Sequence, residues 1–159
     1  MHPNEQLITN FYKAFGDRDF AAMNACYHPE AEFSDEVFTH LKGKQVRAMW
    51  HMLCSASTDL VVEYRNVAAN ELHGQCFWDA FYTFSVTKRR VHNKVTSGFT
   101  FKDGLIIQQQ DSFDFYAWSR MALGTTGLLV GWLPFIKNKI RAQAAKNLAA
   151  FINKHPQYK

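Results

Sequence analysis

Two aspartates stand where strand patterns predict buried side chains, and these are the residues of the sequence best suited to chemistry. Residues 105–118 alternate in character, and the odd positions from 105 to 115 form the more apolar face. Asp111 lies in the middle of that face, and Asp35 takes the same kind of place in the pattern of residues 31–38. A carboxylate is costly to bury unless it is paired, hydrogen-bonded or neutralised. Both positions therefore indicate a functional site.

Two carboxyl groups in one enclosure can have different pKa values, so that one serves as a base and the other as an acid. Each aspartate also has a structural interpretation. Asp111 could accept hydrogen bonds from tyrosine and tryptophan in a filled core, and Asp35 could be a turn or cap residue at a strand end. Asp114 has the opposite parity, with His92, which predicts a place on the outer face of the sheet or in an interface.

Aromatic and polar side chains share the inward direction with these carboxyl groups, and Tyr12 is among them. An apolar enclosure with a few polar groups is the usual construction of a small-molecule pocket. Aromatic residues make up 15% of the chain, which is enough to line one. The predicted lining residues are Phe15, Phe33, Trp50, Trp78, Tyr82, Asn93, Ser97, Phe99, Gln109 and Phe113.

Three helices are predicted before most of the strands. Residues 4–15 repeat apolar side chains along one face of an amphipathic helix. Asp17 is expected to cap a second helix, which ends at His28-Pro29. A third helix is expected over 44–57, where the apolar stripe includes Trp50.

The strands that position the two aspartates are predicted over 31–38, 59–71, 75–87, 91–101 and 105–118. Lys102-Asp103-Gly104 predicts a three-residue hairpin loop with glycine in the left-handed conformation. The resulting register pairs Phe101 with Leu105, Val95 with Asp111, and Asn93 with Phe113. Helices followed by antiparallel strands indicate an α+β fold.

The C-terminal part of the sequence lacks strand alternation. Residues 122–127 are predicted to form a loop, and 135–154 a helix with Ile140 and Ala144 on its apolar stripe. We therefore expect one domain over 1–118 and a loop-and-helix extension over 119–159 that packs on it. The apolar stretch 127–136 could close the pocket or bury against a partner.

Composition narrows the range of partners and compartments. The chain has 159 residues, of which 47% are apolar and 20% charged, and a net charge of +4. The three cysteines lack metal-ligand spacing, and they indicate a reduced, cytoplasmic protein. The basic run 88–90 is expected at a solvated hairpin tip, which argues against nucleic-acid binding. No signal peptide or membrane-spanning run is present, so no membrane partner is expected.

The order of several short motifs resembles the nuclear transport factor 2-like superfamily, which includes SnoaL-like polyketide cyclases, ketosteroid isomerases and limonene epoxide hydrolases. The resemblance covers residues 4–118 and rests on Phe11-Tyr-Lys-Ala-Phe-Gly-Asp-Arg-Asp-Phe20, Tyr27-His-Pro-Glu-Ala-Glu-Phe-Ser-Asp35, Gly43, Asp103-Gly-Leu-Ile106 and Asp111-Ser-Phe-Asp114. It implies a cone-shaped α+β barrel with a central pocket, a homodimer formed through the outer sheet face, and no metal or organic cofactor. Residues 119–159 resemble the C-terminal helical extension of a bacterial branch.

The resemblance also implies roles for single residues. Asp35 matches the general base of the ketosteroid isomerases and Tyr12 their oxyanion tyrosine, whereas Ser97 replaces their second donor, an aspartate. Asp111 matches the water-activating aspartate of the epoxide hydrolases. Their other catalytic positions hold Phe33, Asp35, Trp78 and Ala80 here, which argues against epoxide hydrolysis.

Two functions are therefore considered. The first is a lyase, isomerase or cyclase that acts on a small apolar carbonyl or polycyclic molecule, with Asp35 and Asp111 in proton transfer and Tyr12 as the oxyanion donor. The alternative is a non-catalytic ligand-binding or protein-interaction module.

Overall fold

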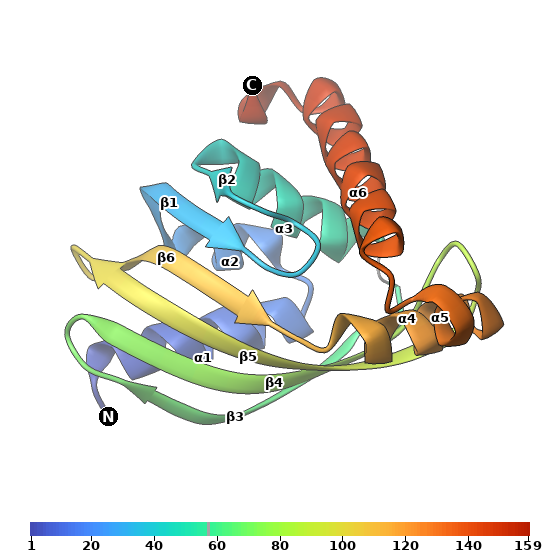
Figure 1. Cartoon of the computed structure of the whole chain (residues 1–159). Coiled ribbons are helices and arrows are strands. Elements are labelled where there is room, and N and C mark those ends of the chain that lie inside the picture. The colour runs from blue at the N-terminus through green and yellow to red at the C-terminus, as the bar shows by residue number, and fades with distance from the viewer. Residues whose placement is uncertain (57) are drawn as a thin grey trace.

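The computed structural model describes residues 1–56 and 58–159, which form a curved sheet with helices on its concave side (Figure 1). Helix α1 spans Pro3–Gly16, α2 Phe20–Ala25 and α3 Lys44–Ala56. The strands are β1 Tyr27–Ser34, β2 Leu41–Lys42, β3 Val61–Ala69, β4 His73–Thr83, β5 Arg90–Lys102 and β6 Leu105–Ser112. The predicted α+β cone is confirmed. The predicted last residue of the third helix, 57, lies outside the described residues.

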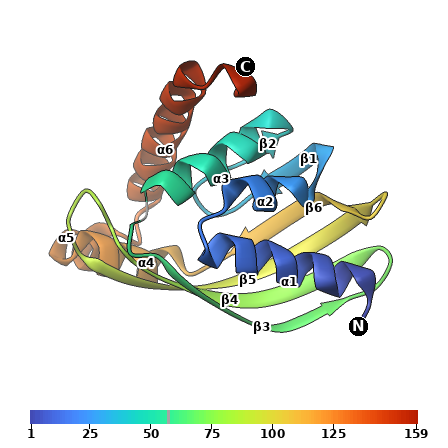
Figure 2. The same cartoon turned by 180° about the vertical axis from the view of Figure 1, so that it is seen from behind.

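The sheet has the order β2-β1-β6-β5-β4-β3, and only the β1–β6 pair is parallel. Strand β1 pairs with the edge of β6 that β5 does not occupy. The helices that precede and follow β1 therefore lie over the concave face. Figure 2 shows α1 and α3 lying against that face. The predicted strand over 31–38 begins and ends earlier, since residues after Ser34 turn towards β2.

Helix α1 begins with a capping box, in which His2 and Glu5 each satisfy a backbone N–H of the first turn. Its apolar stripe is buried at Ile8, Phe11 and Phe15, which drives the packing on the sheet. The predicted cap of the second helix is wrong: Asp19, rather than Asp17, accepts the N–H of Ala22. The predicted end at His28-Pro29 is also wrong, because these residues already belong to β1.

The register of the β5–β6 hairpin differs from the predicted one. Lys102 pairs with Leu105, so the turn contains only Asp103 and Gly104, both with positive φ, as a tight two-residue hairpin turn requires. An irregularity between residues 100 and 101 then shifts the pairing. As a result Ile106 is fully buried, whereas Leu105 and Ile107 are only partly buried. From Gln109 onwards the odd-numbered side chains are the buried ones, as predicted.

This shift changes the partner of the central aspartate. Asp111 lies opposite Ser97, where the pattern predicted Val95, and Gln109 lies opposite Phe99. The inward direction predicted for Asp111 is nevertheless correct, because its side chain is buried. Val95, Ser97 and Phe99 of β5 are buried on the same side of the sheet as Asp111.

The chain after β6 is more helical than expected. Helix α4 spans Phe115–Leu123, α5 Thr125–Val130 and α6 Pro134–Lys154, followed by the short 3-10 helix Pro156–Tyr158. The predicted strand through 118 and the predicted loop over 122–127 are therefore wrong. Gly127 explains the second error: a Cβ there would lie 1.9 Å from the Ser119 carbonyl oxygen, so only glycine lets α5 pack this closely on α4.

Candidate active site

A cavity of about 420 Å³ lies between the sheet, α3 and α6. Its wall is mainly apolar, with contributions from α1, the strands and α4. Asp35 and Asp111 both reach it from different strands or strand ends. The predicted lining residues that do line it are Phe15, Phe33, Trp50, Trp78, Tyr82, Asn93 and Phe113.

Asp111 is buried, and its Oδ1 atom accepts two hydrogen bonds from protein groups. The Ser97 hydroxyl donates at 2.5 Å and the Gln109 amide at 3.0 Å. The Ser97 oxygen in turn accepts from the Tyr12 hydroxyl at 2.7 Å and from the Trp78 indole N–H at 2.8 Å. Since Ser97 has one hydrogen and tryptophan can only donate, the Ser97 hydrogen goes to Asp111.

A second chain of donors reaches the same oxygen from the other side. The indole N–H of Trp50 donates to the Tyr27 hydroxyl at 2.8 Å, and Tyr27 donates to the Gln109 side-chain oxygen. The Gln109 amide is thereby oriented with its N–H towards Asp111. Both chains begin at a tryptophan, an obligate donor, and therefore both deliver hydrogens to Oδ1.

These two chains determine where a proton can sit on Asp111. Oδ1 acts as an acceptor in both bonds, so a proton held by this carboxyl group belongs on Oδ2. Within the described part of the chain Oδ2 makes no hydrogen bond, and Asp111 lines the cavity. The exchangeable proton therefore lies on the side from which a bound molecule would approach.

Burial is the main cause that raises the pKa of Asp111, to about 7, from an ordinary value of 3.8. The hydrogen bonds from Ser97 and Gln109 oppose this rise because they favour the charged form, and the negative charge of Asp35 adds to it. A carboxyl group with a pKa near neutrality is populated in both protonation states at physiological pH. It can therefore accept or donate a proton.

Asp35 follows β1 and combines the two roles considered for it. Its Oδ1 accepts the backbone N–H groups of Val37 at 2.7 Å and Phe38 at 2.6 Å, which makes it the organiser of the turn after β1. It also lines the cavity, and desolvation raises its pKa to about 6 despite those two hydrogen bonds. Asp35 is thus a structural residue with a titratable carboxyl group at the cavity wall.

Four predicted site residues lie behind the cavity wall. Tyr12, Ser97 and Gln109 are buried in the hydrogen-bond network that holds Asp111. Phe99 packs edge-on against Tyr12, with ring centroids 6.4 Å apart. The hydroxyl of Tyr12 is directed to Ser97, which gives it a position suited to supporting Asp111.

Helix α6 supplies a wall that the strand pattern did not suggest. Ile140, Gln143, Ala144 and Asn147 line the cavity from this helix. Ile140 and Ala144 belong to the apolar stripe predicted for residues 135–154, so the stripe was the available signal. That the stripe lies over the cavity depends on how the C-terminal segment packs against the rest of the domain.

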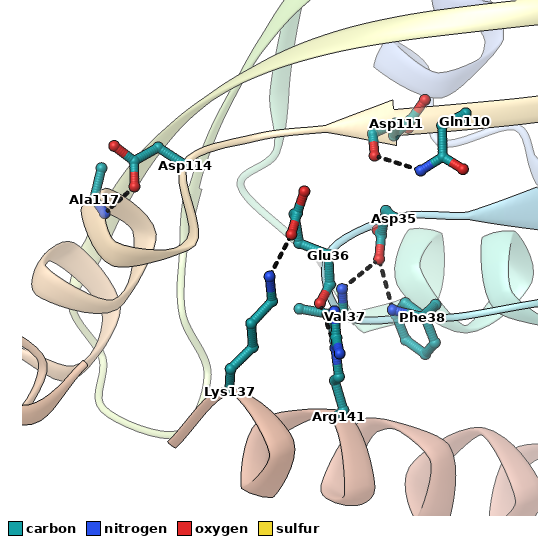
Figure 3. A network of polar contacts seen from close by, with 10 residues as sticks. All are labelled: Asp35, Glu36, Val37, Phe38, Gln110, Asp111, Asp114, Ala117, Lys137 and Arg141. Carbon is teal, nitrogen blue, oxygen red and sulfur yellow. Dashed lines mark hydrogen bonds and ion pairs between the residues drawn. The ribbon is translucent and has the colours of Figure 1, made fainter. Parts of the chain in front are cut away.

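Two contacts at residue 36 attach α6 to the turn that contains Asp35, as Figure 3 shows (Figure 3). The Lys137 ammonium group pairs with the Glu36 carboxylate, and the Arg141 guanidinium donates to the Glu36 carbonyl oxygen at 2.9 Å. The wall formed by α6 is therefore joined directly to the segment next to Asp35.

Asp114 has a structural position outside the cavity. Its Oδ1 accepts the N–H of Ala117 at 3.0 Å and so caps the first turn of α4 (Figure 3). The nearby Gln110 side chain donates to the Asp111 carbonyl oxygen rather than to its carboxylate. The pattern correctly separated Asp111 from Asp114, although the predicted outer-face strand position of Asp114 is wrong.

Neither a metal cluster nor a membrane-crossing helix is found among residues 1–56 and 58–159. No group of three or more His, Cys, Asp or Glu side chains there is arranged to hold a metal ion. No helix in that part of the chain has both the length and the apolar character to cross a bilayer. The three cysteines are free and buried.

The sequence profile of the SnoaL-like domain matches residues 8–109. No curated protein matches the chain with significance. A similar solved structure is an NTF2-like protein of unknown function from Burkholderia pseudomallei, with a TM-score of 0.65, 16% identity, and coverage of 76% of this chain and 98% of that one.

Two other similar structures belong to proteins that are named for different activities. An epoxide hydrolase of the limonene epoxide hydrolase-like type from Mycobacterium tuberculosis has a TM-score of 0.60 and 18% identity, and the match covers 84% of this chain and 95% of that one. A candidate polyketide cyclase from a Silicibacter species has a TM-score of 0.61 and 18% identity, with 74% and 93% covered. At these identities the likenesses establish the fold.

Proposed function

The chain belongs to the SnoaL-like domain family, and from this premise we propose that it transfers protons on a small apolar molecule held in the central cavity. The reaction class that fits is isomerase, lyase or cyclase chemistry beside a carbonyl group. One observation carries the proposal: Asp111 has Oδ1 bound by two donor chains and Oδ2 left for the cavity. Such an arrangement holds a carboxyl group in one orientation for proton transfer.

Asp111 and Asp35 divide the proton transfer in this proposal. The ionised form of Asp111 takes a proton from a carbon next to the substrate carbonyl group through Oδ2. Asp35 also lines the cavity, and its pKa is raised to about 6. It returns or relays a proton at a second position of the substrate.

A donor for the developing negative charge on the substrate oxygen is also needed. Tyr82 lines the cavity, and its hydroxyl oxygen accepts from the Trp118 indole N–H at 2.8 Å. Among the described residues the Tyr82 hydroxyl hydrogen has no acceptor, so it is available to a ligand. We assign the oxyanion role to Tyr82, because the Tyr12 hydroxyl is already directed to Ser97.

The test uses a panel of β,γ-unsaturated ketones, including polycyclic ones, and follows formation of the conjugated enone by its ultraviolet absorbance. Asp111→Asn is expected to abolish turnover and to retain binding of the product ketone, because the amide keeps the shape of the side chain. Gln110→Ala is the matched control, since the Gln110 side chain donates to the Asp111 backbone carbonyl oxygen and not to its carboxylate. Turnover by Asp111→Asn at the wild-type rate would refute the assignment.

The alternative function is binding without catalysis, and the place of Asp35 in the turn favours it. Both Asp35 hydrogen bonds organise residues 35–38, as a purely structural residue would. To test this alternative, ligands are extracted from the purified protein, identified by mass spectrometry and incubated with wild-type protein. Binding without catalysis requires that they stay unchanged. Conversion of the same ligand by wild-type protein, but not by Asp111→Asn, would exclude it.

The homodimer and the cytoplasmic location implied earlier stay predictions. The outer face of the sheet offers a charged cluster for such an interface: Asp79 is bound by Arg65 at 2.8 Å and by His92 at 2.7 Å. Light scattering after size-exclusion chromatography measures the oligomeric state directly. An Asp79→Ala variant is expected to weaken a dimer formed through this face.

A further inference from the structure

Large apolar side chains are exposed together at one end of the molecule. We name this group the apolar tip, and it comprises residues from the β4–β5 turn, α5, the linker between α5 and α6, and the start of α6. The exposed fractions are Val86 79%, Leu128 54%, Leu129 65%, Trp132 64% and Phe135 68%. Large apolar side chains gathered on one part of a protein surface mark an interaction site.

Hydrogen bonds show that the segments of the apolar tip are neighbours. The Thr87 hydroxyl donates to the Ala122 carbonyl oxygen, and Arg89 Nε donates to the Met121 carbonyl oxygen at 2.8 Å. These bonds place the β4–β5 turn beside the end of α4, where α5 begins. Figures 1 and 2 both show the turn, α4, α5 and the start of α6 at the end of the molecule away from the N-terminus.

Charge is distributed unequally along the chain. All 14 acidic residues occur at or before Asp114, so the segment 115–159 has none. The basic residues of that segment are Arg120, Lys137, Lys139, Arg141, Lys146, Lys154 and Lys159. The C-terminal extension is therefore strongly positive within a chain whose net charge is only +4.

Four of the chain's exposed basic residues flank the apolar tip. Lys88 and Arg89 belong to the β4–β5 turn, and Lys139 follows Phe135 on α6. The Arg120 guanidinium lies 4.8 Å from the Tyr116 ring centroid, and the Tyr116 hydroxyl donates to the Leu128 carbonyl oxygen. Arg120 is thereby held beside α5.

We propose that the apolar tip binds the surface of a membrane that carries anionic lipid headgroups. Apolar side chains enter the boundary between headgroups and acyl chains, and the flanking cations bind the headgroups. Trp132 suits this place, because its indole N–H already donates to the Leu129 carbonyl oxygen at 3.1 Å and its ring is exposed.

The charges favour a membrane over a second copy of the chain as the occupant. A symmetric contact between two apolar tips would bring together the flanking basic residues of both copies, which are Lys88, Arg89, Arg120 and Lys139. Like charges in such a contact oppose association, whereas an anionic bilayer attracts all of them. The expectation of no membrane partner rested on the lack of an apolar run long enough to span a bilayer. Attachment to the surface of a bilayer needs no spanning helix.

The membrane-binding surface also borders the cavity. Val86 of the apolar tip lines the cavity, as do Phe84 of the same turn and Trp118 of α4. An apolar molecule dissolved in the bilayer would meet the protein at this end. Attachment itself does not depend on the proposed proton transfer, because it is measured without a substrate.

The first test is co-sedimentation with vesicles of phosphatidylcholine, alone or mixed with phosphatidylglycerol. Wild-type protein is expected to sediment with the anionic vesicles, and the double variant Trp132→Ser/Phe135→Ser to bind at least about tenfold more weakly. Leu72→Ser is the matched control, because Leu72 is equally exposed but lies in the distant β3–β4 turn. Circular dichroism establishes that each variant is folded.

The second test removes charge beside the apolar tip. Arg120→Gln and Lys139→Gln are each expected to weaken binding to the anionic vesicles about fivefold, with no effect for Lys94→Gln on the outer face of the sheet. Raised salt should weaken binding of the wild-type protein as well. Absence of wild-type binding would overturn the proposal, as would equal binding by the double variant.

Light scattering distinguishes the other occupant of the apolar tip. We expect the wild-type protein and the Trp132→Ser/Phe135→Ser variant to have the same molar mass in solution. A lower mass for the variant, together with no binding of wild-type protein to vesicles, would identify a second copy of the chain as the occupant and would overturn the membrane assignment.

Discussion

Ser97 lies directly opposite Asp111 in the β5–β6 ladder and donates a 2.5 Å hydrogen bond to its Oδ1 atom. The same Ser97 oxygen accepts hydrogen bonds from Tyr12 and Trp78, so its one hydrogen is committed to the carboxylate. This relationship favours the ionised form of Asp111 within an environment that otherwise favours the neutral form. It also directs any bound proton to the oxygen that faces the cavity.

Replacement of Ser97 by alanine is expected to raise the pKa of Asp111 above its present value of about 7, because the hydrogen bond that favours the charged form is lost. The donors of Tyr12 and Trp78 would lose their acceptor, at a cost of about 1–3 kcal/mol in the free energy of unfolding. Carbon-13 NMR titration of the Asp111 carboxyl group measures the first effect. Ser112→Ala, at an exposed position of β6, is the control, and an unchanged pKa in Ser97→Ala would contradict the network.

The free energy of unfolding is expected to depend on pH through Asp111. Its pKa is about 7 in the folded state and near 3.8 in the unfolded state. Below the lower value both states are protonated. As pH rises towards 7 only the unfolded state releases its proton, so the folded state loses stability, on the order of 4 kcal/mol in total.

Urea denaturation of wild-type protein and Asp111→Asn at several pH values isolates this contribution. The variant should gain stability relative to wild type across the interval from about pH 4 to pH 7, because its side chain does not titrate. The burial of Asp35 is common to both proteins, so the difference reports the titration of Asp111 together with its electrostatic interaction with Asp35. A difference that is constant with pH would show that Asp111 has an ordinary pKa.

Tyr12 and Tyr82 are expected to respond differently to loss of the hydroxyl group. Tyr12→Phe removes a buried hydrogen bond to Ser97 and should lower the free energy of unfolding by about 1 kcal/mol, with a shift in the pH profile of turnover. Tyr82→Phe should lower kcat about tenfold or more, because Tyr82 lines the cavity and its hydroxyl hydrogen has no acceptor among the described residues. The opposite ranking of kcat would return the oxyanion role to Tyr12.

The attachment of α6 at residue 36 should have a measurable coupling energy. Glu36 and Lys137 are each more than two-thirds buried, so a double-mutant cycle with Glu36→Gln and Lys137→Gln is expected to give about 1 kcal/mol. The exposed pair Asp59–Arg90 serves as the comparison and should give less. Hydrogen exchange of the α6 amides should accelerate in Glu36→Gln, and unchanged protection would mean that the Lys137–Glu36 ion pair does not hold α6 in place.

Much of the site could be predicted because strand alternation is a local property. The parity of residues 109–113 placed Asp111 inward and separated it from Asp114, and the same rule found Trp78, Tyr82 and Asn93. Helical periodicity found α1, α3 and α6 within a few residues of their ends. Each of these features follows from the spacing of apolar residues within one element.

Other features depend on contacts between distant segments. The two-residue turn at Asp103-Gly104 and the irregularity before Phe101 decided that Ser97 faces Asp111, and a shift of this kind is set by pairing with the whole sheet. Gly127 packs on α4 in a stretch whose composition suggested a loop, because tertiary packing overrode local preference.

The sequence by itself determined that an α+β chain would bury two carboxyl groups among aromatic side chains. Only the tertiary structure decided that Asp111 receives donors on one oxygen, that Asp35 also organises a turn, and that Tyr12 supports the network from behind the cavity wall. It also decided that α6 covers the cavity and that the apolar tip stays exposed. The physical reason is that alternation fixes the direction of a side chain, whereas its partners are fixed by register and by the folding back of distant helices.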